Sequence, residues 1–107
     1  MDDLIREIQQ RFNTFELSVR NLRKSAEEYA NAEREYKILL RTEILKLRDE
    51  GVPVGIVDKI CYGIPEVADL RYKRDLAEAV YKANMESINT QKLQIRIIDN
   101  QIQREWK

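Results

Sequence analysis

The chain has no histidine, one cysteine, three glycines and two prolines among its 107 residues. Without histidine it lacks the commonest general base and a frequent metal ligand, and a single cysteine forms neither an internal disulfide nor a zinc site. We therefore expect no metal, no cofactor and no enzymatic activity. The lone Cys61 fits a reducing compartment, and the lack of an apolar run of about 18 residues argues against a membrane span.

The charges balance, with 19 basic and 19 acidic residues. A zero net charge argues against a general polyanion-binding protein, although a local basic patch is still allowed. The sequence starts with Met1, Asp2 and Asp3, so it has two acidic residues where a signal peptide would carry positive charge. We expect no signal peptide, no membrane partner and a cytoplasmic location.

Charged residues make up 36% of the chain and hydrophobic residues 43%, a combination that is typical of long helices and coiled coils. All the glycines and prolines lie within residues 51–65. This segment separates two uninterrupted periodic arms. We predict an all-α single domain over residues 1–107, built as a long antiparallel helical hairpin of coiled-coil type. Its first helix covers 2–50, its tip with a short helix 51–65, and its second helix 66–106.

In the first arm, apolar residues recur at steps of three and four from Leu4 to Leu47, as on one face of a helix. The pair Asn13-Thr14 is the weakest point of this pattern and allows a break. The stripe of the second arm runs from Leu70 to Trp106 and contains Asn84 and Gln91. We interpret these two polar residues as setting the register between paired helices.

Several apolar residues lie off these main stripes, which indicates more than one packing partner. In addition, if Glu50 lay near Glu66, the first arm would extend about two turns beyond the second. Its first apolar residues would then lack a partner within the chain. We therefore predict a homo-oligomeric bundle whose interface includes Leu4, Ile8, Leu76, Leu93 and Ile97.

The tip begins at Gly51, which is placed to end the first helix in a left-handed conformation. Its residues Ile56, Val57, Ile60 and Cys61 have the spacing of a short amphipathic helix. We expect this helix to cover the last apolar layer of the hairpin.

Basic and aromatic residues gather in and beside the tip, and we call this set the basic-aromatic cluster: Arg48, Lys59, Tyr62, Arg71, Tyr72, Lys73 and Arg74. Arginine forks and tyrosine rings suit a phosphate or a nucleotide. Acidic residues are interleaved with the cluster, so a mutually neutralised, solvated surface is the alternative. A DNA-reading helix-turn-helix is disfavoured because Asp58 and Asp69 occupy positions that should be apolar.

The second half of the chain carries the patterns LR-x-EG-x-PV, VA-x-LR, D-x-AEA-x-Y and a closing NQI-x-REW, between Leu47 and Trp106. In these it resembles small helical accessory proteins of phages and prophages of Gram-positive bacteria. The resemblance implies a phage origin and the cytoplasm of a host cell. It favours a non-enzymatic binding protein, for example a counter-defence factor that binds a host protein or sequesters a signalling nucleotide. A nucleic-acid accessory protein of phage replication or recombination and a structural oligomerisation module are the alternatives.

Overall fold

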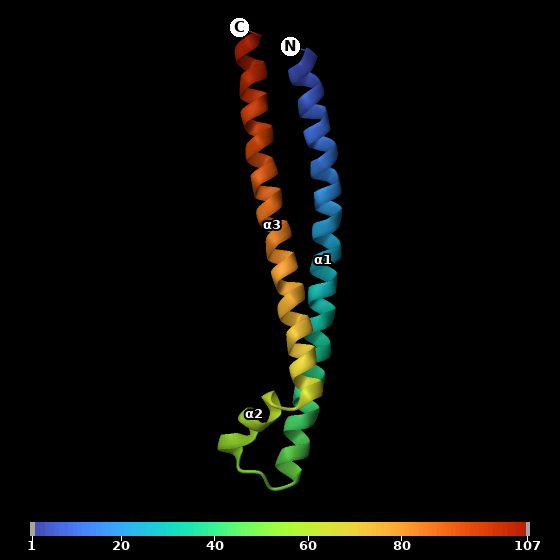
Figure 1. Cartoon of the computed structure of the whole chain (residues 1–107), viewed down its shortest axis with the longest axis vertical. Helices are drawn as coiled ribbons and strands as arrows, with labels where there is room; N and C mark the ends of the chain where they lie inside the picture. Colours follow the sequence, from blue (N-terminus) through green and yellow to red (C-terminus); the bar gives the residue numbers. More distant parts are fainter. Residues whose placement is uncertain (1, 107) are drawn as a thin grey trace. The chain divides into compact units, whose positions relative to one another are not determined.

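The computed structural model describes residues 2–106 and contains three helices and no strand within that range. They are α1 (Asp2–Asp49), α2 (Val54–Tyr62) and α3 (Pro65–Glu105). Figure 1 shows α1 and α3 as the two arms of a hairpin, joined by the segment that carries α2. The predicted all-α helical hairpin with a short helical tip is confirmed.

Helix α1 continues without a break through Asn13 and Thr14. The break that the sequence allowed there does not occur, because two residues of modest helix propensity cost little inside a long amphipathic helix. The helix has Asp2 and Asp3 in its first turn and basic residues in its last. Both ends therefore carry charges that complement the helix macrodipole.

Gly51 ends α1 with a φ of 85°, in the left-handed region. The N–H of Val52 donates to the carbonyl of Leu47 at 3.0 Å, and the N–H of Gly51 donates to Arg48 at 3.1 Å. This pair of bonds is a Schellman motif, which satisfies carbonyls that the helix end would leave free. Helix α3 begins at Pro65, where the missing N–H of proline removes no helical hydrogen bond.

The chain divides into two compact units. Unit 1 consists of Met1–Ser25 and Val80–Lys107, and unit 2 is Ala26–Ala79. Unit 2 contains α2 with parts of both long helices, and it buries Tyr36, Val57, Cys61 and Val67. The predicted short amphipathic helix thus buries its Val57 and Cys61 side.

Unit 1 is a single layer of two antiparallel helix segments and has much less of a core. Among its described residues only Ser25, Ile88 and Ile98 are buried, and the other stripe residues are at most half-buried. Two helices have one mutual contact line, so each side chain on it remains open to solvent on its flanks. In unit 2 the third helix, α2, covers side chains that would otherwise be open to solvent.

The register of the arms differs from the expected one. In unit 2 the ring of Tyr36 lies against Arg74, so Pro65, nine residues before Arg74, lies opposite about residue 45 of α1. The expectation that Glu50 lies near Glu66 is therefore wrong. Helix α1 extends past the start of α3, and the tip with α2 occupies the space beside its last turns (Figure 1).

The start of α1 accordingly has partners within the chain. Leu4 lies beside Gln101 and Arg104 of α3, and Ile8 lies beside Ile95. The inference that Leu4 and Ile8 lack an intramolecular partner is wrong, because it rested on the wrong register. Both residues are nevertheless only half-buried.

Candidate functional site

A polar seam joins the two helices of unit 1. The amide Nε2 of Gln91 donates to Ser18 Oγ at 2.7 Å and to Ser87 Oγ at 3.1 Å. Seven residues away on each helix, Asn84 Nδ2 donates to Ser25 Oγ at 2.9 Å. The same amide-to-serine pair thus recurs after one heptad, and both pairs require the same alignment of α1 and α3.

The seam leaves one acceptor unused. Oε1 of Gln91 is buried and has no hydrogen-bond partner among the described residues. An unsatisfied buried carbonyl costs about 1–3 kcal/mol. The seam therefore aligns the helices and also lowers the stability of the isolated unit.

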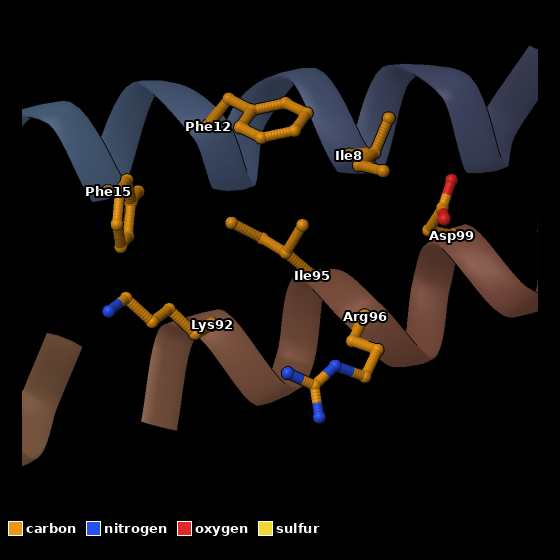
Figure 2. Close-up of a pocket in the computed structure, with 7 residues that line it drawn as sticks. All are labelled: Ile8, Phe12, Phe15, Lys92, Ile95, Arg96 and Asp99. Atoms are coloured by element: carbon orange, nitrogen blue, oxygen red, sulfur yellow. The ribbon is translucent and has the colours of Figure 1, made fainter. Parts of the chain in front are cut away.

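An open apolar hollow of about 540 Å³ lies beside the seam, also in unit 1. Its α1 side is formed by Ile8, Phe12 and Phe15. Figure 2 shows Ile95 of α3 pointing toward α1, opposite Phe12 and between Phe15 and Ile8. Phe12 is 48% exposed although it belongs to the apolar stripe. A large aromatic surface at the mouth of a hollow is a common feature of binding sites.

The α3 rim of the hollow is charged, with Lys92, Arg96 and Asp99. Within residues 2–106, Lys92 takes part in no ion pair. Asp99 uses one carboxylate oxygen to accept a bond of 3.2 Å from Gln103. An apolar floor with a rim of both charge signs suits a polypeptide better than a uniformly apolar molecule.

The predicted basic-aromatic cluster lies in unit 2, where its arginines form two separate stacks. The Arg71 guanidinium lies 5.0 Å from the centre of the Tyr62 ring. That of Arg74 lies 4.6 Å from the centre of the Tyr36 ring. The structure therefore brings Arg71 and Tyr62 together and pairs Arg74 with a residue outside the predicted cluster.

Arg74 also binds Asp75, at 2.9 Å through Nε and 2.8 Å through Nη2. Partial burial alone would lower the pKa of Arg74, but the hydrogen bond and charge of Asp75, together with nearby Tyr36 and Glu33, outweigh it and raise the pKa. The guanidinium is permanently charged, and an acidic neighbour already compensates that charge. The guanidinium of Arg74 thus stacks on Tyr36 with its face and binds Asp75 with its edge.

The other members of the cluster, Arg48, Lys59, Tyr72 and Lys73, are exposed. Tyr72 is 68% exposed. Among the residues predicted for an oligomer interface, Leu76, Leu93 and Ile97 are 53%, 54% and 50% exposed. These apolar side chains are therefore open to a partner.

Cys61 is fully buried in unit 2. Burial raises the pKa of its thiol, and the nearby carboxylates of Asp58 and Glu43 raise it further. The thiol therefore remains protonated and is a poor nucleophile at neutral pH. Over the described range, histidine, cysteine and acidic side chains form no group suited to a metal ion.

Sequence reasoning missed the hollow because it assigned Phe12 and Phe15 to the core of the hairpin. It also missed the serine partners of the seam. A signal for both existed in the heptad spacing: Ser18 and Ser25, Asn84 and Gln91, and Lys92 and Asp99 are each seven residues apart.

No helix within residues 2–106 combines the length and apolarity that crossing a bilayer requires. Comparison with known proteins finds no family model, no curated protein and no solved structure that matches the chain.

Proposed function

We propose that this chain is a non-enzymatic interaction protein that binds another helical polypeptide in the hollow of unit 1. The observation that carries the proposal is the exposure of Phe12, 48%, over an apolar floor of Ile8, Phe15 and Ile95. A helix laid along this floor would cover the flank that a two-helix layer leaves open. Helix-in-groove binding of this kind uses apolar anchors spaced at three and four residues.

The resemblance to phage proteins supports a narrower form of the same proposal. In that form the bound polypeptide is a host protein, and the chain acts by occupying it, as a counter-defence factor would. The charged rim around the apolar hollow suits this role. Charged residues at a rim exclude unsuitable partners, while apolar anchors supply affinity.

In vivo photo-crosslinking tests the proposal. The full chain is expressed in a Gram-positive host with the photoreactive residue benzoylphenylalanine in place of Phe12. A matched variant carries it in place of the exposed Gln10, about 160° away around α1 at 100° per residue. We expect cross-linked protein adducts from position 12 and few from position 10. Equal, background-level cross-linking from both positions would contradict the proposal.

The alternative function is binding of a signalling nucleotide or nucleic acid in unit 2. It is supported by Arg71, whose side chain stacks over Tyr62 at 5.0 Å. Both residues are exposed. The pairing of Arg74 with Asp75 reduces the positive charge available there. This alternative requires that the chain binds labelled oligonucleotides or cyclic dinucleotides in a salt-dependent way and that Arg71→Ala abolishes the binding. No binding at low salt would exclude the alternative.

A further inference from the structure

We infer that the polypeptide in the hollow is a second copy of this chain, packed antiparallel so that Lys92 of each copy meets Asp99 of the other. The inference rests on the proposed interaction function and specifies its partner as a second copy, in place of the host protein of the narrower form. It follows from the surface area of the chain, from the spacing of charges along the rim, and from the bonds these charges already make.

The chain exposes more surface than a folded protein of its mass usually does. Its accessible area is 8134 Å², whereas a compact monomer of 12.7 kDa exposes about 6,200 Å². The difference is roughly 1,900 Å², and a standard interface needs only about 800 Å² from each partner. The chain therefore has enough excess surface for a stable dimer.

The rim charges have the spacing that a symmetric antiparallel pair requires. Lys92 and Asp99 both line the hollow and are seven residues, or about two turns, apart on the same side of α3. In a two-fold pair of antiparallel helices, the axis passes midway between residues that meet each other's copies. Here the midpoint falls between Ile95 and Arg96, so both residues would lie near their own copies at the axis, between the two ion pairs.

The existing contacts of these charges fit the same arrangement. Within the described part of the chain Lys92 has no acidic partner, and Asp99 has one carboxylate oxygen that Gln103 does not use. By contrast, Arg11 is already satisfied by Glu7 at 3.9 Å and Gln94 at 2.9 Å. Lys92 and Asp99 are thus two rim charges that are still able to bind a partner and that are complementary under the two-fold.

Sedimentation equilibrium of the full chain at low ionic strength tests the inference. We expect the wild type to form a dimer at micromolar concentration. Lys92→Asp and Asp99→Lys each replace two attractions by two repulsions and should raise the dimer Kd at least about 10-fold. An equimolar mixture of the two variants should dimerise again, because the acidic pair of one then faces the basic pair of the other. Glu86→Lys, about 120° around α3 from Lys92, should leave the Kd unchanged.

The outcomes separate this inference from the proposed function. A monomeric wild type, or a dimer whose Kd ignores both charge reversals, would overturn the antiparallel pairing. If position 12 then still cross-links to other proteins, the interaction function stands and only the identity of the partner is wrong. If position 12 gives adducts of twice the chain mass that Lys92→Asp removes, both hold.

Discussion

Asn84 of α3 donates a hydrogen bond of 2.9 Å to Ser25 Oγ of α1, and Ser25 in turn donates at 2.9 Å to the carbonyl of Leu22. The buried hydroxyl thus has both an acceptor and a donor within the polar seam of unit 1. The amide-to-serine bond repeats one heptad away, from Gln91 to Ser18. Sliding α3 by one turn would break both pairs, so the seam opposes alternative registers.

The first prediction concerns this pair. Asn84→Ala should lower the free energy of unfolding by about 1 kcal/mol, because Ser25 loses its cross-helix donor. A double-mutant cycle with Ser25→Ala should give a coupling energy of about 0.5–1.5 kcal/mol. Urea unfolding followed by circular dichroism at one fixed protein concentration measures both. The exposed Asn89 is the control, and Asn89→Ala should change stability by less than about 0.5 kcal/mol. Strict additivity of the two seam mutations would contradict the prediction.

The end of α1 and the start of α3 could be predicted from the sequence to within one residue, because glycine and proline act through the local backbone. Gly51 supplies the left-handed conformation that closes α1, and Pro65 starts α3. The register could not be predicted in the same way. It depends on how much of α1 the tip and α2 cover, which is decided by the burial of Val57 and Cys61 rather than by local propensity.

The candidate sites likewise combine features that the sequence predicts with features that depend on the tertiary structure. The sequence identified the right residue types for an anion site, but the pairing of Arg74 with Tyr36 joins residues 38 positions apart and depends on the tertiary register. Similarly, Phe12 has the periodicity of a core residue. Its exposure follows from the number of helices in unit 1, which periodicity alone does not determine.

The second prediction concerns Arg74. Arg74→Ala should destabilise the chain by about 1–2 kcal/mol, because it removes both the stacking on the buried Tyr36 ring and the packing of the arginine stem. Arg74→Lys should recover only part of this loss, since an ammonium group cannot stack and bind Asp75 with a planar fork. Arg71→Ala is the matched control in an exposed stack and should cost less than about 1 kcal/mol. Equal effects of the two alanine variants in thermal unfolding would contradict this ranking.

The third prediction compares two glycines that both face open space. Gly51 has a φ of 85°, whereas Gly55 lies inside α2. At neither position would an added Cβ meet another atom within 4 Å. Gly51→Ala should destabilise by about 1–2 kcal/mol because a left-handed conformation strains any residue with a Cβ. Gly55→Ala should stabilise by up to about 1 kcal/mol, since alanine loses less backbone entropy in a helix. Chemical unfolding midpoints distinguish the two, and effects of the same sign would show that backbone conformation does not decide them.

The fourth prediction concerns Cys61. Its thiol pKa is raised in the folded chain by burial and by nearby carboxylates, whereas an unfolded cysteine ionises near about pH 8.5. As the pH rises past that value, the unfolded state releases the thiol proton first, so the free energy of unfolding falls. Below that pH the contribution is fully present. The same burial should make the native thiol react with a disulfide reagent far more slowly than the thiol in urea.

Cys61→Ala isolates this contribution. The variant should be less stable at neutral pH by about 1 kcal/mol, because it leaves a small cavity in unit 2. Its unfolding free energy should nevertheless vary less with pH between about 8 and 9.5, because the variant lacks the thiol that ionises there in the unfolded state. Urea titrations at half-unit steps of pH, wild type beside variant, measure the difference in slope. Parallel curves over that interval would mean that the thiol ionises equally in both states, and the decline at alkaline pH would then belong to other groups.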